Sequence, residues 1–169
     1  MFTCFLGTDG REPARPNAAH RVLAKWEAQG RLRRVITQNI DGLHAAAGSR
    51  DLVEYHGHCR RLTCLRCGGG LPLNAETIRA PVPRCPCGGL LKPDFVFFGE
   101  GIPEAAQEAA DEAALRTDCM VLVGTSGVVY PAAAVPVLAK RRGAFIIEVN
   151  PEATDYSGRI VDLFLPMKA

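Results

Sequence analysis

Short apolar segments alternate with longer amphipathic stretches along much of the chain. Strands are expected at 35–36, 52–55, 95–98, 120–123 and 144–149. A first helix is expected to begin at Pro16-Asn17 and to stop at Gly30, with Trp26 in the core. Further helices are expected in a short segment that ends at 48, from 103 to about 115, and over about 131–142. The strand at 144–149 is apolar apart from Glu148, which is typical of a parallel sheet covered by helices on both faces. The pattern predicts an α/β fold.

The segment 59–92 interrupts this pattern. It is rich in Cys, Gly, Pro and Arg, shows no helical or strand period of useful length, and is expected to build no hydrophobic core of its own. Two close pairs of thiols, separated by 17 residues, form the donor set of a tetrahedral zinc site: Cys64, Cys67, Cys85 and Cys87. Four cysteines leave no position for water, so the site is expected to be structural, although the second pair is one residue tighter than the usual CxxC.

Composition and charge narrow the class of protein. The chain has 169 residues, of which 47% are hydrophobic and 22% charged, as in an ordinary globular domain. The net charge is only +2 and the basic residues are scattered, so no nucleic-acid partner is expected. No apolar stretch approaches the ~20 residues that cross a bilayer, and no signal peptide is visible. We therefore expect no membrane partner and a cytoplasmic location, where the seven cysteines stay reduced and favour metal over disulfides.

A candidate nucleotide site follows the apolar segment 120–123. The small, hydroxyl-rich turn Gly124-Thr125-Ser126 lies between a strand and a helix, where open parallel sheets bind nucleotides. Asn150 ends the next strand, at a place where dinucleotide-binding folds commonly hold ribose hydroxyls. Simple helix capping by Thr125 and Ser126 remains the alternative.

Six motifs in order along the chain resemble the sirtuin family. They are Thr37-Gln38-Asn39-Ile40-Asp41, His56-Gly57, the cysteine pairs, the run from Lys92 to Glu100, Gly124-Thr125-Ser126 and Glu148-Val149-Asn150. The resemblance begins at about Pro16 and implies a Rossmann-like sheet, built from 1–58 and 93–169, that carries a zinc ribbon at 59–92. It implies an NAD-dependent enzyme that removes acyl groups, such as acetyl, from protein lysines and releases nicotinamide and O-acyl-ADP-ribose.

The resemblance also implies roles for single residues. His56 would be the general base, a role that suits the unperturbed imidazole pKa of ~6.5. Residues in two segments would bind NAD: Gln38, Asn39, Ile40 and Asp41 on the nicotinamide side, and Gly124, Thr125, Ser126, Asn150, Pro151 and Glu152 on the adenosine side. Val96 and Phe98 would line the tunnel for the acyl-lysine, and Gly99 and Glu100 would pair with the substrate peptide.

One feature of the family has no counterpart in the sequence. Sirtuins open with a strand and a Gly-Ala-Gly loop, whereas the only glycine-containing run before Pro16 is Gly7-Thr8-Asp9-Gly10, which neither follows a strand nor opens a helix. Weak or absent NAD-dependent turnover by this polypeptide is therefore expected. The main alternative is a non-catalytic zinc-containing module that binds protein or nucleic acid. A zinc hydrolase is disfavoured because the metal site is closed and no HExxH helix is present.

Overall fold

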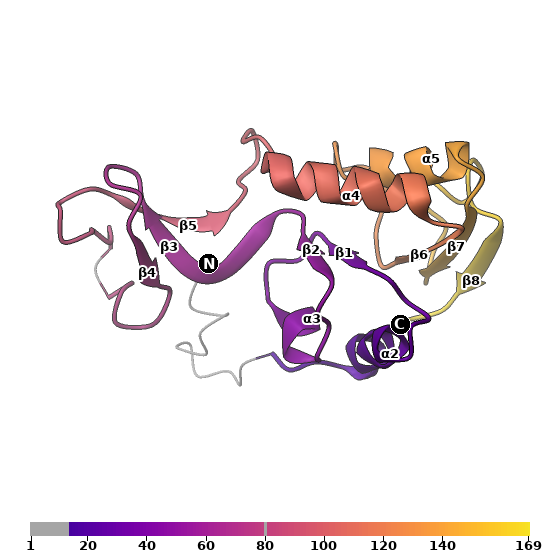
Figure 1. Ribbon diagram of the computed structural model, residues 1–169, viewed down its shortest axis with the longest axis horizontal. Coiled ribbons are helices and arrows are strands. Elements are labelled where there is room, and N and C mark those ends of the chain that lie inside the picture. Colours follow the sequence, from indigo (N-terminus) through magenta and orange to yellow (C-terminus); the bar gives the residue numbers. More distant parts are fainter. Residues whose placement is uncertain (1–13, 80) are drawn as a thin grey trace. The chain divides into compact units, whose positions relative to one another are not determined.

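The computed structural model describes residues 14–79 and 81–169, and the chain divides into two compact units, Met1–Gly101 and Ile102–Ala169 (Figure 1). The expectation about Gly7-Thr8-Asp9-Gly10 lies outside the described residues.

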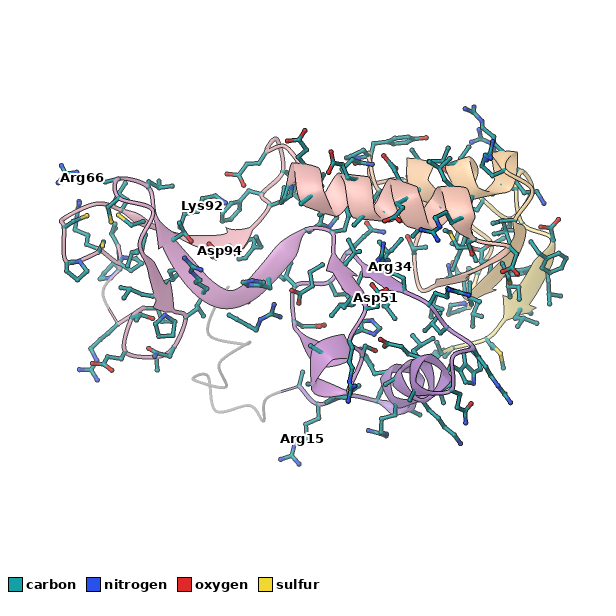
Figure 2. All side chains as sticks on the ribbon, in the orientation of Figure 1. Arg15, Arg34, Asp51, Arg66, Lys92 and Asp94 are labelled. Atoms are coloured by element: carbon teal, nitrogen blue, oxygen red, sulfur yellow. The ribbon has the colours of Figure 1, made fainter. Side chains whose placement is uncertain are left out.

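The first unit begins with helix α2 (Ala18–Ala28), followed by strand β1 (Val35–Thr37), helix α3 (Leu43–Ala46) and strand β2 (Leu52–Glu54). Asn17 caps α2, since its side chain accepts a hydrogen bond of 3.1 Å from the backbone N–H of His20. β1 and β2 pair in parallel, and the ion pair between Arg34 and Asp51 joins the residues that precede the two strands (Figure 2). These elements confirm the sequence-based expectations. The expected burial of Trp26 is wrong, because α2 is a surface helix without buried residues and Trp26 is 40% exposed.

An antiparallel sheet occupies the segment that was expected to lack regular structure. Its strands are β3 (Gly57–Cys64), β4 (Gly70–Pro72) and β5 (Leu91–Phe95), in the order β4-β3-β5. It also has a small core, which was not expected, made of Leu62, Cys64, Leu73 and Leu91. The core residues are too widely spaced in the sequence to give a periodic signal, and only strand pairing brings them together.

Strand β5 ends where a strand was predicted to begin. The apolar run at 95–98 continues as a turn in which the N–H of Glu100 donates to the carbonyl oxygen of Phe97, and Phe98 is 98% exposed. β5 instead contains Pro93, which an edge strand tolerates because one side of its backbone needs no ladder hydrogen bond.

The second unit is an α/β layer. Helix α4 (Glu104–Arg116) precedes strand β6 (Cys119–Val123), helix α5 (Ala134–Arg141), strand β7 (Phe145–Asn150) and strand β8 (Leu163–Pro166). The strands are parallel in the order β6-β7-β8, α5 packs on the sheet, and α4 lies beside α5 (Figure 1). All of these elements except β8 match the expected ones.

The two faces of this sheet differ within the second unit, where α5 packs on the sheet. Ile146, Glu148 and Asn150 lie on the buried face of β7. On the opposite face, Val121 and Val123 are each 40% exposed. Among the described residues, no helix is long and apolar enough to cross a membrane.

Candidate functional site

His56 follows β2 directly and is held in one tautomer by the backbone. Its Nδ1 lies 3.1 Å from the carbonyl oxygen of Gln38, and a carbonyl oxygen only accepts, so Nδ1 carries the proton. Nε2 has no hydrogen-bond partner among the described residues and is not fully buried. The free lone pair of His56 is therefore on Nε2, as a general base requires.

Gly57 brings the candidate base next to the end of β5. It has φ of +74°, and a Cβ there would lie against the carbonyl oxygen of Asp94 and 2.9 Å from Cα of Phe95. This close approach lets the N–H of Val96 donate to the carbonyl oxygen of His56 over 3.0 Å. Gly57 thus connects the position of His56 to the segment with Val96, Phe98, Gly99 and Glu100.

The loop after β1 carries the other polar candidates of the first unit. Thr37 Oγ1 accepts from the N–H of Asn39, and Asp41 Oδ1 accepts from the N–H of Leu43 at the start of α3. The Asn39 side chain is exposed, whereas Gln38, Ile40 and Asp41 are half-buried. The structure brings this loop and His56 together through the Gln38 carbonyl.

Lys92 organises the turn that follows β5. Its Nζ donates to the carbonyl oxygen of Phe95 over 2.9 Å, forms an ion pair with Glu100 over 3.0 Å, and lies 5.0 Å from the centre of the Phe97 ring. Glu100 also accepts from the N–H of Phe97 over 2.9 Å. This N–H, followed by Lys92, lowers the pKa of Glu100 below its ordinary value. One cation therefore contacts both ends of the turn, at Phe97 and at Glu100.

Replacing Lys92 with Met is expected to loosen this turn without unfolding the unit. The exchange protection of the Phe97 amide should fall by about fivefold, the scale of one partly exposed ion pair, as measured by hydrogen exchange. Lys92→Arg keeps the charge and should retain most of the protection. Equal protection in wild type and Lys92→Met would show that the ion pair does not hold the turn.

The four predicted metal ligands converge at one end of the β4-β3-β5 sheet. Their sulfur atoms all lie within 4.8 Å of one another, and the separations are 3.6 Å for Cys64–Cys87, 3.8 Å for Cys67–Cys85 and 3.6 Å for Cys67–Cys87. Tetrahedral zinc with Zn–S bonds of ~2.3 Å requires sulfurs ~3.8 Å apart, so the cluster fits zinc. The N–H groups of Cys67 and Arg66 lower the pKa of Cys64 to about 6, whereas the pKa of Cys87 is raised to about 12, with the side chains of Cys64 and Cys67 among the causes.

Two similar turns explain why the tighter second pair still fits. In the first turn the N–H of Cys64 donates to the Gly69 carbonyl oxygen, and in the second the N–H of Cys85 donates to that of Gly89. The second turn is thus one residue shorter, as is the spacing between its cysteines. A Cβ on Gly89 would lie 2.6 Å from the sulfur of Cys64, so a glycine is needed there.

The predicted adenosine-side residues form an edge of the second unit. Gly124 follows β6 directly with φ of +61°, and a Cβ there would meet no atom within 4 Å. Asn150 ends β7, and its Nδ2 donates to the Thr125 carbonyl oxygen over 2.8 Å, which joins the two strand ends. Ser126, Pro151 and Glu152 are exposed beside them. Asn150 Oδ1 accepts no hydrogen bond from the described residues and is left open for a donor such as a ribose hydroxyl.

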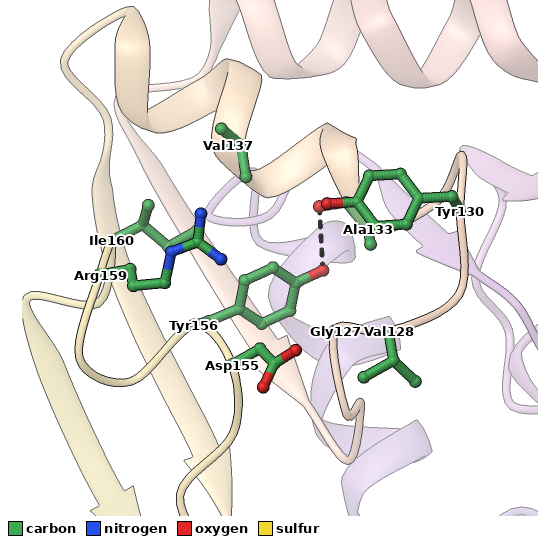
Figure 3. A pocket seen from close by; sticks show the side chains of 9 residues that line it. All are labelled: Gly127, Val128, Tyr130, Ala133, Val137, Asp155, Tyr156, Arg159 and Ile160. Carbon is green, nitrogen blue, oxygen red and sulfur yellow. Dashed lines mark hydrogen bonds between the residues drawn. The ribbon is translucent and has the colours of Figure 1, made fainter.

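The same unit has a small cavity. Its volume is about 150 Å³, and its lining includes Tyr130, Asp155 and Arg159 (Figure 3). The Tyr156 hydroxyl donates to the Ala133 carbonyl oxygen over 3.1 Å, and its ring leaves no room for a Cβ on Gly127. The cavity contains none of the residues that the sequence predicted to bind a cofactor.

Sequence reasoning assigned no role to three residues that build these sites, Gly57, Lys92 and Glu148. Each belongs to one of the six motifs, but its role depends on contacts that the sequence does not show: Gly57 with Asp94 and Phe95, Lys92 with Glu100, and Glu148 with Thr154. Apart from the metal ligands, the predicted site residues fall into two sets, one in each unit. The first unit holds Gln38 to Asp41, His56, Val96 and Phe98 to Glu100, and the second holds Gly124 to Ser126 and Asn150 to Glu152.

Comparison with known proteins identifies the family. The sequence pattern of the Sir2 family matches residues 2–131. A protein of Aeropyrum pernix named NAD-dependent protein deacylase is 49% identical over 157 residues, which cover 92% of this chain and 63% of that protein. Another of the same name, from Thermococcus kodakarensis, is 48% identical over 163 residues, or 92% of this chain and 63% of that protein. The chain thus spans slightly less than two thirds of the length of these relatives.

Solved structures give the same result. A structure of Sir2 bound to an acetylated peptide has a TM-score of 0.88 and 38% identity, with 91% of this chain and 66% of that one covered. A structure of Sir2 with a p53 peptide and NAD+ has a TM-score of 0.87 and 39% identity, with 91% and 65% covered. These similarities confirm the Rossmann-like α/β fold, and together with the family match they show that the chain belongs to the Sir2 family, the sirtuins.

Proposed function

We propose that this chain performs NAD-dependent removal of acyl groups from protein lysines, with His56 as the general base. The observation that carries the proposal is the imidazole of His56, whose Nδ1 proton is held by the Gln38 carbonyl while Nε2 is free. The names of the relatives and the acetylated peptide in a similar structure support it.

The residues present fit NAD, whose bound form would supply the ribose that accepts the acyl group as nicotinamide leaves. His56 Nε2 would take a proton from a ribose hydroxyl, and the carbonyl of Gln38 would stabilise the imidazolium by accepting from Nδ1. On the adenosine side, Asn150 Oδ1 and the exposed carboxylate of Glu152 are acceptors for hydroxyl groups. The peptide would pair with Gly99 and Glu100.

The remaining expectations belong to the same proposal. A Rossmann-like domain of 1–58 and 93–169 with a zinc ribbon at 59–92 is supported by the separate core of Leu62, Leu73 and Leu91. Neither nucleic acid nor a membrane is proposed as a partner, since several arginines bind within the chain: Arg60 to Glu54, Arg66 to the Cys87 carbonyl and Arg84 to the Gly88 carbonyl. A cytoplasmic location belongs to the same proposal, because the thiols of the zinc site would stay reduced there.

The test is mass spectrometry of an acetyl-lysine peptide incubated with the zinc-loaded chain, with and without NAD. Deacetylation should require NAD and should fall by about a hundredfold or more in His56→Asn, the scale of a lost general base. Turnover that does not need NAD, or that survives His56→Asn unchanged, would contradict the proposal. The wild-type rate also tests the expectation of weak turnover drawn from Gly7-Thr8-Asp9-Gly10. Peptide binding that His56→Asn preserves, without turnover in either protein, would favour the non-catalytic module.

A further inference from the structure

Glu148 is a buried charge in the middle of an apolar strand. It lies in β7 and is 0% exposed. Burial of a carboxylate costs free energy unless it is paired or hydrogen-bonded, and no cation forms an ion pair with Glu148 in the described part of the chain. The cost suggests that the carboxylate has a role beyond filling the core.

Three neutral donors satisfy this carboxylate. Thr154 Oγ1 donates to Oε1 over 2.6 Å, Ser157 Oγ donates to Oε2 over 2.5 Å, and Asn150 Nδ2 donates to Oε1 over 3.3 Å. Burial raises the pKa of Glu148, but the hydrogen bonds from Ser157, Thr154 and Asn150 outweigh it, and the pKa lies below its ordinary value. Glu148 is therefore ionised near neutral pH and acts only as an acceptor.

An ionised acceptor restricts the orientation of the Asn150 amide. An asparagine amide has a donor end and an acceptor end, and a 180° flip exchanges them. Nδ2 of Asn150 lies between two acceptors, Glu148 Oε1 and the Thr125 carbonyl oxygen. A flip would place Oδ1 against both, so the observed orientation is favoured and Oδ1 points away from them.

The carboxylate also holds the segment that follows Asn150. The two hydroxyls that donate to it, those of Thr154 and Ser157, also accept hydrogen bonds from the backbone. The N–H of Thr154 donates to Ser157 Oγ over 2.8 Å, and the N–H of Tyr156 donates to Thr154 Oγ1 over 3.2 Å. One buried group thus fixes both the Asn150 amide and the turn at 154–157.

We propose that Glu148 is a positioning residue for nucleotide binding, which orients the Asn150 amide so that Oδ1 is presented as the acceptor at the end of β7. The proposal rests on the proposed function in one respect, that this edge binds the adenosine half of NAD. Glu148 itself would not contact the nucleotide, because its carboxylate is buried beneath Asn150 and the turn at 154–157.

Two variants of equal side-chain length test the proposal. Glu148→Gln keeps a carbonyl acceptor for Asn150 and Thr154, whereas Glu148→Met has none. We expect ADP-ribose to bind Glu148→Gln within about threefold of wild type and Glu148→Met about tenfold or more weakly, as measured by calorimetry. In an Asn150→Ala background, Glu148→Met should cause no further loss of affinity for ADP-ribose, since its effect passes through Asn150.

A second readout does not depend on the nucleotide. The side-chain amide resonance of Asn150, assigned by its disappearance in Asn150→Ala, should be protected from exchange in wild type and Glu148→Gln, and shifted and unprotected in Glu148→Met. If Glu148→Met does not fold, Glu148→Asp carries the same expectation, because its shorter side chain withdraws the carboxylate from Asn150.

The outcomes separate the two proposals. If the Asn150 resonance changes in Glu148→Met but the wild type binds no ADP-ribose, Glu148 orients Asn150 as proposed and the adenosine site is contradicted. A folded Glu148→Met variant with an unchanged Asn150 resonance and unchanged ADP-ribose affinity would overturn the positioning role, whatever the deacetylase assay gives. If the losses of ADP-ribose affinity caused by Glu148→Met and Asn150→Ala are additive in the double variant, the positioning role is also overturned.

Discussion

Removal of zinc is expected to unfold the β4-β3-β5 sheet. The core beneath the cluster consists of only a few side chains, Leu62, Leu73 and Leu91 with Cys64, and is too small to stabilise the sheet by itself. Structural zinc in comparable sites contributes about 10 kcal/mol or more of binding free energy, which is folding free energy when the ligands converge only in the folded chain. Chelation should therefore abolish the exchange protection of the amides in β3 and β5, while those in β6 and β7 of the other unit remain protected.

The measurement is hydrogen exchange with mass spectrometry before and after chelation, with metal content determined by elemental analysis. One zinc per chain is expected, and Cys64→Ser should lose it. Cys119→Ser is the matched control, because Cys119 is an exposed thiol in β6 outside the cluster. A metal-free chain with the amides of β3 still protected would show that the leucine core suffices.

Local signals in the sequence predicted much of the fold. The Asn17 cap, the apolar strands β1, β6 and β7, and the helices between them depend on neighbouring residues, and they lie where expected. Strand β3 could not be predicted this way, because Arg60 and Arg61 lie on it and its burial alternates only near Leu62. Phe97 and Phe98 gave a strand signal, yet Lys92 and Glu100 hold them in a turn.

The candidate site shows the same division. The types of its chemical groups, an imidazole after one strand and an amide after another, were visible in the sequence at His56 and Asn150. Their orientation was not, since it comes from the Gln38 carbonyl and from the buried carboxylate of Glu148. A charged residue in an apolar strand is a weak signal until the structure shows that no cation but three neutral donors surround it.

Gly57→Ala is expected to be the most damaging substitution of a single glycine near His56. Two costs combine: φ of +74° is unfavourable for alanine by about 1 kcal/mol, and the new Cβ would meet the backbone at Asp94 and Phe95. Both contacts are backbone atoms, so no side chain can rotate away, and the start of β3 must separate from the end of β5. We expect a total loss of about 3 kcal/mol or more in the free energy of unfolding of the first unit, as measured by urea denaturation.

Gly30→Ala separates the two costs. Gly30 has nearly the same φ, +70°, but a Cβ there meets no atom within 4 Å, so only the backbone term of about 1 kcal/mol should appear. The difference between the two variants measures the close approach of β3 and β5. Because this approach allows the bond between the Val96 N–H and the His56 carbonyl, Gly57→Ala should also abolish the proposed deacetylation, whereas Gly30→Ala should not. Equal stability losses in the two variants would mean that the strands near His56 are not in contact as the structure shows.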